Sequence, residues 1–196
     1  MYVDENGNSF ILAILIGAAI GAIAGVASQA VSDVCSNVAQ HKLDFSSWEM
    51  SSWQTYAGAA IGGAIGGAFT PFLGPVSTAF ITGFSQTFIT MGLSNLTSDS
   101  KYSFGEMLCS SLLIGGVAGL TAGVLDNIKI PKINSGRGSL SAIAKQINTK
   151  LVKEQIKNVS IKTLGKMLAL NLIYSAPFAV LNGFFTNGIV LTPKEL

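Results

Sequence analysis

The sequence predicts an all-α fold: a bundle of about six to eight hydrophobic helices and helical hairpins, packed through glycine zippers and either embedded in a membrane or able to enter one. Three observations support this prediction. Charged residues make up 11% of the 196 residues and apolar residues 49%, whereas an ordinary soluble domain is about 25% charged. Long segments have no charge at all, and glycines recur four residues apart. A chain this apolar is not disordered.

Four segments without charged residues are long enough to cross a membrane. They are residues 9–32, 50–98, 107–125 and 167–193. A helix needs about 20 predominantly apolar residues to cross the hydrocarbon core, so each segment allows one crossing. The second allows two, because Pro71 and Pro75 would end one helix and begin the next. Gly, Ala and Ser fill many positions and make insertion marginal, so we expect conditional insertion rather than permanent residence.

Glycine spacing is the most specific signal in the sequence. The pattern GxxxGxxxG occurs three times, at Gly17, Gly21 and Gly25, at Gly58, Gly62 and Gly66, and at Gly115, Gly119 and Gly123. Residues four apart share one helix face, so each set forms a flat groove that a second backbone can approach. Each Gly costs about 1 kcal/mol of helix propensity relative to Ala. We interpret the nine glycines as helix-packing residues rather than as a chance product of composition.

The second and third glycine sets lie in an internal repeat. Ser46-x-x-Glu49 and Ser103-x-x-Glu106 have the spacing of capping boxes, which begin helices. We interpret residues 46–67 and 103–124 as two copies of a cap-plus-helix unit. The predicted organisation is therefore a glycine-zipper region, residues 1–128, with helical units at 9–40, 46–98 and 103–128, and a basic region, residues 129–196.

A phenylalanine stripe lies between the two copies. Phe80, Phe84 and Phe88 are four residues apart, and Met91 follows on the same side. This spacing is more typical of a seam between helices than of a ligand site. Polar residues of the same segment, among them Gln86 and Asn95, suit either a polar pore wall or a solvated face.

The C-terminal third has a different charge balance. Residues 1–128 hold two Lys and eight acids, a sum of −6, whereas residues 129–196 hold nine Lys and Arg137 against two acids, a sum of +8. A helix following Ser139 would have an apolar face and, on its other arc, Lys145, Lys150, Lys153 and Lys157. Such a helix fits an anionic membrane surface, or equally a core helix with a solvated lysine face. An apolar helix divided at Pro177 is predicted after it.

No catalytic, metal or cofactor site is predicted. The single histidine, His41, has no catalytic or metal-binding neighbours, and Cys35 and Cys109 are 74 residues apart without a CxxC motif. These cysteines fit buried small residues better than a disulfide. The acids fit helix ends and caps, and one Arg does not provide the dense basic surface of a nucleic-acid binder. We therefore expect a protein that is not an enzyme, needs no cofactor and binds no nucleic acid.

Two segments resemble a known family. Tyr2-Val3-Asp4-Glu5-Asn6-Gly7 resembles the YxDPxG signature that closes the core of RHS-repeat (YD-repeat) polymorphic toxins, with Glu5 in place of proline. A Gly/Ala-rich stretch like Ile11–Gly25 often follows in that family, and residues 136–166 look like the C-terminal tails of such proteins. The resemblance touches about a quarter of the chain. It implies the variable C-terminal region of a secreted or contact-delivered protein, whose glycine-zipper helices insert into membranes, and it supplies no catalytic residues.

The sequence thus predicts a membrane-inserting bacterial toxin or effector domain that permeabilises or crosses a target-cell membrane. Expected partners are a bilayer with anionic lipid, a second copy of the chain and an immunity protein. The alternative is a non-catalytic packing or delivery domain, or a multi-span membrane protein, belonging to a larger RHS-type protein. An enzyme whose site has no sequence signature is a third interpretation.

Overall fold

The computed structural model describes residues 8–40, 42, 44–70, 72–98, 101–126, 129–130, 138–139, 165–166, 168–169, 172–173 and 176–181. Most of them belong to four helices: α1 (Asn8–Ala39), α2 (Trp53–Phe69), α3 (Pro75–Thr97) and α4 (Phe104–Asp126). A 3₁₀ turn, η1 (Phe45–Ser47), precedes α2, and two short strands, β1 (Lys129–Ile130) and β2 (Gly138–Ser139), pair antiparallel. The described chain is therefore all-α apart from this small ladder.

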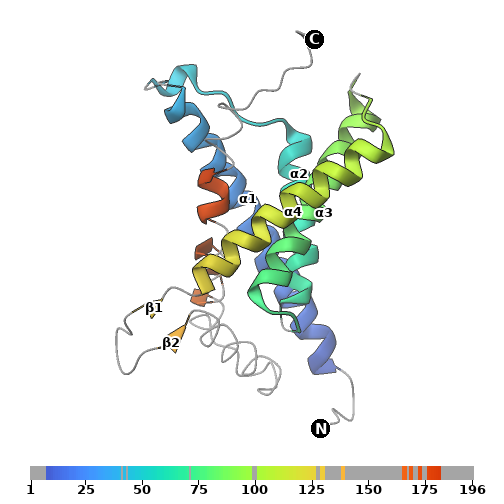
Figure 1. Ribbon diagram of the computed structural model, residues 1–196, viewed down its shortest axis with the longest axis vertical. Coiled ribbons are helices and arrows are strands. Elements are labelled where there is room, and N and C mark those ends of the chain that lie inside the picture. Colours follow the sequence, from blue (N-terminus) through green and yellow to red (C-terminus); the bar gives the residue numbers. More distant parts are fainter. Residues whose placement is uncertain are drawn as a thin grey trace.

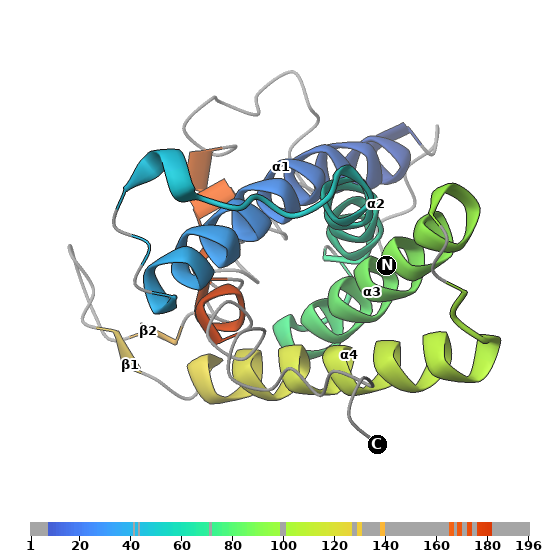
Figure 2. The same cartoon turned by 90° about the horizontal axis from the view of Figure 1, so that it is seen from above.

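The helices pack in chain order, α1 on α2, α2 on α3 and α3 on α4. Seen from above, α1 and α4 run along opposite sides, and α2 and α3 lie between them (Figure 2). The helical residues 176–181 lie beside α1 in both views (Figures 1 and 2). Each helix therefore meets its sequence neighbours, as short connections between helices favour.

The prolines and the second capping box set the helix bounds as predicted. α2 ends at Phe69, and α3 begins with Pro75 at its first turn, where the missing N–H costs nothing. At the start of α4, the backbone N–H of Ser103 donates to Glu106 Oε2 at 2.7 Å, and the Glu106 N–H donates to Ser103 Oγ at 3.3 Å. The predicted break and this capping box are both confirmed.

The first capping box was wrongly predicted. Ser46 lies in η1, and α2 begins only at Trp53, with Ser52 as its N-cap. The Glu49 N–H donates instead to Asn37 Oδ1 at 2.9 Å, and the Glu49 carboxylate pairs with Lys42. Contacts with α1 hold this segment, so the repeat with residues 103–124 does not extend to the helix start.

The interior is made of small and polar side chains. Among the residues whose burial the structure describes, the buried apolar ones are Ala13, Ile20, Ala24, Ala59, Met107, Ala118, Ala122 and Ala179. The buried polar residues are Gln29, Ser32, Asp33, Asn37, Gln54, Thr78 and Ser111. An ordinary soluble core is dominated by Leu, Ile, Val and Phe. This interior instead lets helices approach one another closely and encloses hydrogen-bonded groups.

Candidate functional site

The first glycine set lies where α1 crosses α2. A Cβ atom added at Gly17 would collide with the carbonyl oxygen of Gly67, one at Gly21 with that of Gly63, and one at Gly25 with that of Ala59. The obstructing atoms are backbone, so no side-chain rotation could relieve the collisions. The two backbones can approach this closely because both helices present small residues at the crossing.

The second glycine set faces α3 from an adjacent face of α2. A Cβ atom at Gly62 would lie 2.5 Å from the Gln86 backbone nitrogen, and those at Gly58 and Gly66 would collide with the Thr90 and Thr82 hydroxyls. Thus α2 is packed on two sides, one facing α1 and one facing α3. Gln86 of α3 was among the polar residues expected to form a pore wall or a solvated face. In the structure, Gln86 packs against α2.

Sequence reasoning missed the face of α2 that meets α1. This face consists of Ala59, Gly63 and Gly67, which are themselves four residues apart. The signal was present in the glycine pairs at 62–63 and 66–67, since a second set offset by one residue marks a second packing face. Two faces on one helix identify α2 as the centre of the α1–α2–α3 packing.

The third glycine set packs more loosely against the phenylalanine stripe. A Cβ at Gly115 would lie 2.9 Å from the Phe80 carbonyl oxygen, one at Gly119 would lie 3.3 Å from that of Val76, and one at Gly123 would lie 3.5 Å from the Val76 side chain. The rings of Phe80 and Phe84 stack at 6.2 Å, and those of Phe84 and Phe88 at 6.0 Å. The stripe therefore forms a seam between α3 and α4, as its spacing indicated.

Large apolar side chains lie on the outside of α1 and α4. The exposed ones are Ile11, Leu15, Ile23, Val26, Val31, Val34 and Val38 on α1, and Phe104, Leu108, Leu112, Leu113, Val117, Leu120 and Val124 on α4. Within the described residues, Ala13–Ala39 and Phe104–Leu125 are long and apolar enough to cross a membrane. Their most apolar windows are 33% and 28% buried, whereas the core helix of a soluble protein is mostly buried. We call the exposed apolar side chains of α1 and α4 the apolar belt.

A buried carboxylate connects α1 to the start of α2. Asp33 is 5% exposed, and its Oδ1 accepts hydrogen bonds from Gln29 Nε2 at 2.9 Å and Ser51 Oγ at 2.6 Å. Its Oδ2 accepts from the Ser51 N–H at 3.0 Å and the Tyr56 hydroxyl at 2.6 Å. Four donors thus satisfy both oxygens of the carboxylate. We call Gln29, Asp33, Ser51 and Tyr56 the Asp33 cluster.

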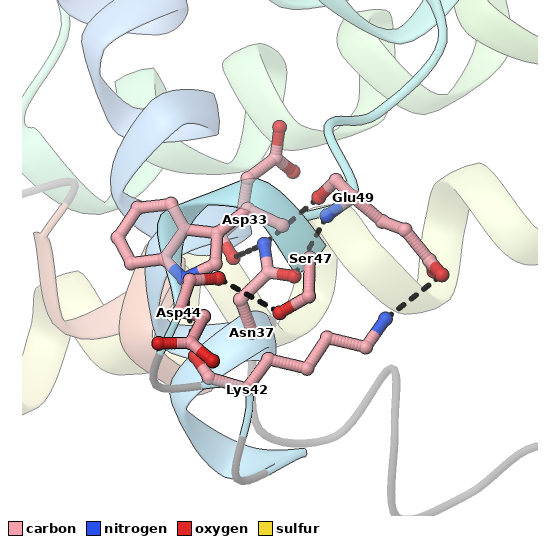
Figure 3. Close-up of polar contacts among 7 residues, drawn as sticks. Asp33, Asn37, Lys42, Asp44, Ser47 and Glu49 are labelled. Atoms are coloured by element: carbon pink, nitrogen blue, oxygen red, sulfur yellow. Dashed lines mark hydrogen bonds and ion pairs between the residues drawn. The ribbon is translucent and has the colours of Figure 1, made fainter.

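The turn before α2 is held against α1 by a second set of polar contacts (Figure 3). Asn37, 2% exposed, donates through Nδ2 to the Glu49 carbonyl at 2.8 Å, while its Oδ1 accepts from the Glu49 N–H. Trp48 Nε1 donates to the Lys42 carbonyl at 3.0 Å, and Lys42 Nζ lies 2.8 Å from the Glu49 carboxylate. Since that carboxylate is largely exposed, the ion pair adds little stability, and the amide of Asn37 fixes the turn.

Tyr56 has an altered acidity in the Asp33 cluster. Burial raises the pKa of its hydroxyl, and the hydrogen bond to Asp33 and that residue's negative charge raise it further. The folded chain should therefore keep Tyr56 protonated above its ordinary pKa of 10.0, and the associated stability should be lost as the pH rises beyond that value. Subtracting the tyrosinate absorbance of Tyr56→Phe from that of the wild type isolates this titration. A midpoint near 10 in the folded chain would contradict the prediction.

Two predictions about individual residues need correction, and one set of residues is not described. Asp33 was assigned to a helix end, but it lies inside α1 and is buried because its donors replace water. Cys35 and Cys109 were both expected to be buried, but Cys35 is half-buried and Cys109 is exposed, and both are free thiols. Lys145, Lys150, Lys153 and Lys157, with the helix predicted to hold them, lie outside the described residues.

The described residues offer packing faces, an apolar belt and the Asp33 cluster, but they contain no group of three or more His, Cys, Asp or Glu residues that could hold a metal ion. Compared with protein-family models, with curated proteins and with solved structures, the chain gives no match.

Proposed function

We propose that the chain is a membrane-inserting domain of a bacterial toxin or effector, which permeabilises or crosses a target-cell membrane through glycine-packed helices. The distribution of side chains supports this proposal most directly. Polar groups such as Asp33 and Asn37 are buried, while seven of the described large apolar side chains on each of α1 and α4 are exposed. In water this arrangement leaves apolar surface unburied, whereas in a bilayer it places that surface against lipid.

The helix contacts also suit a bilayer. Lipid tails are as apolar as leucine, so helices in a membrane associate through close backbone packing and hydrogen bonds rather than through the hydrophobic effect. The α1–α2 crossing consists of glycine and alanine, and the Asp33 cluster ties the same two helices together. Length and composition alone would also fit a core helix or a signal sequence. The proposal therefore depends on these contacts together with the apolar belt.

The proposed target and partners follow from the sequence. A basic C-terminal third favours an anionic lipid surface, and the resemblance to RHS-repeat toxins favours a secreted or contact-delivered protein with an immunity protein as its inhibitor. Assembly of several copies would give a pore. Function then resides in helix packing and lipid contact, without catalysis.

A second candidate function is a static multi-span or delivery domain. One observation favours it: the first and second glycine sets are already filled by backbone or side chains of the same chain, and so are Gly115 and Gly119. Those faces cannot also hold a second copy unless the bundle opens. A domain of this kind would occupy a membrane without making it permeable.

Dye release from anionic liposomes distinguishes the two functions. We expect the purified full chain to release dye, and Gly62→Leu/Gly119→Leu to lose that activity because both substitutions would push α3 away. The matched control is Gly105→Leu/Gly116→Leu, since a Cβ at either position meets nothing within 4 Å; it should retain full release.

Two results would contradict the proposal. If the folded wild-type chain inserts but releases no dye, the static domain is the better assignment. If Gly62→Leu/Gly119→Leu releases dye as the wild type does, permeabilisation does not depend on the glycine faces. Circular dichroism of each variant establishes that helices are present before release is compared.

A further inference from the structure

A half-open cavity lies between the helices beside the Asp33 cluster. Its volume is about 310 Å³, and α1, α2, α3 and α4 all contribute to its walls. Nine of its twelve described lining residues are polar, including Ser32, Ser36, Thr87 and Thr90. Because a water molecule occupies about 30 Å³ in the liquid, the cavity has room for about ten waters. Its polar walls provide hydrogen-bonding partners, so we expect it to be filled with water.

Asp33 is the charged residue among the described lining residues. Its four hydrogen-bond donors come from Gln29, Ser51 and Tyr56, all of which are neutral. These donors hold the negative charge in place without cancelling it. A cleft with low-dielectric walls and charge of one sign concentrates ions of the opposite sign by about tenfold or more.

We propose that this cavity is a water-filled vestibule that admits hydrated cations and disfavours anions, with Asp33 as the residue that sets the preference. The inference rests on the proposed membrane function, in which the vestibule forms part of the path across the bilayer. Ionisable residues within membrane proteins face such cavities and mark ion paths, and charged side chains select the sign of the ion.

The hydrogen bonding of Asp33 indicates which kind of cation fits. Both carboxylate oxygens already accept two hydrogen bonds each, so neither has a lone pair left for a dehydrated metal. A divalent ion such as Ca²⁺ takes six to eight oxygen ligands directly. The carboxylate therefore acts through its field on an ion that keeps its own water.

Charged thiol reagents test the inference without requiring current through a pore. Thr87 lines the cavity, and its hydroxyl donates only to the Gly83 carbonyl one turn earlier, so Thr87→Cys disturbs little. In a full chain with Cys35 and Cys109 replaced by Ser, we compare the rates of this thiol with a cationic and an anionic methanethiosulfonate. A free small thiol such as 2-mercaptoethanol already favours the cationic reagent, because the reacting thiolate is negative. We expect the cationic-to-anionic rate ratio at position 87 to be about tenfold higher than that of the free thiol. Zwitterionic micelles keep lipid charge from biasing the rates.

Two comparisons assign that preference to Asp33. Adding Asp33→Asn should bring the rate ratio at position 87 close to that of the free thiol, while a chain whose only thiol is Cys109, exposed on α4, should keep its own ratio after the same change. Raising the salt from about 0.1 M to 1 M should also lower the ratio at position 87, and by more than it lowers the ratio of the free thiol, because the Debye length falls from about 10 Å to 3 Å. The salt comparison requires no variant of Asp33 to fold.

The inference is overturned if the rate ratio at position 87 in low salt equals that of the free thiol, or if Asp33→Asn and high salt leave the excess over the free thiol unchanged. Either result would leave the membrane function untouched, because dye release is measured separately. Conversely, a chain that shows the charge preference but releases no dye would have the vestibule without permeabilising a membrane.

Discussion

Gly21→Ala is expected to lower the free energy of unfolding by about 3 kcal/mol, at the upper end of the usual cost of overpacking. The added methyl would collide with the Gly63 carbonyl oxygen and lie 2.8 Å from the Gly67 Cα. Most overpacked cores relax by rotating side chains, but here both obstructing atoms are backbone. The α1–α2 crossing would therefore have to widen along its whole length, which would also strain the Asp33 cluster at its far end.

Gly116→Ala is the matched control, and the sign of its effect should be opposite. A Cβ at Gly116 meets nothing within 4 Å, so the change adds no collision and gains up to about 1 kcal/mol of helix propensity. Unfolding in detergent micelles, followed by circular dichroism, measures both variants. If both substitutions changed the free energy of unfolding equally, the two backbones at the α1–α2 crossing would be farther apart than they are in the structure.

Local sequence signals predicted the parts of the fold that local interactions determine. Pro75 begins α3 because proline suits the first turn of a helix, and Ser103 with Glu106 begins α4 because each side chain reaches the other's backbone within one turn. The phenylalanine stripe predicted a seam because its spacing defines a face. None of these predictions depended on which other helix lies opposite.

Contacts between distant segments could not be predicted from the same signals. Ser46 and Glu49 have the spacing of a capping box, yet Asn37 binds the Glu49 backbone from another helix and the box does not form. The spacing of Gly17 and Gly21 marked a face, but only the structure shows that Gly67 and Gly63 cover it. Asp33 had one signal that was overlooked: with Gln29 and Asn37 it forms a polar stripe four residues apart.

Asp33→Ala should also destabilise the fold, by about 3 kcal/mol. Removing the carboxylate leaves the half-buried Tyr56 hydroxyl and Ser51 groups without their acceptor, while the Gln29 amide keeps its hydrogen bond to Ser51 Oγ. An unsatisfied group costs about 1–3 kcal/mol when it is buried. Relief of the buried charge offsets part of that loss. Asp44→Ala is the control, because Asp44 is an exposed acid, and its effect should lie within about 0.5 kcal/mol.

Asp33→Asn separates the loss of hydrogen bonds from the loss of charge. The asparagine oxygen can still accept from Gln29 and from the Ser51 hydroxyl, and its Nδ2 can donate to the Tyr56 oxygen, but that Nδ2 then faces the Ser51 N–H, donor against donor. Its cost should therefore be about half that of Asp33→Ala. If Asn proves as harmful as Ala, the negative charge itself holds the cluster together.

A double-mutant cycle with Tyr56→Phe tests whether the bridge from α1 to α2 is a direct interaction. The Tyr56 hydroxyl lies 2.6 Å from Asp33 Oδ2, so the two substitutions should be non-additive by about 1 kcal/mol. Additive effects would mean that each residue stabilises its own helix separately. Coupling would mean that the same carboxylate that gives the cavity its charge also fixes the angle between α1 and α2, so ion preference and hairpin geometry could not vary independently.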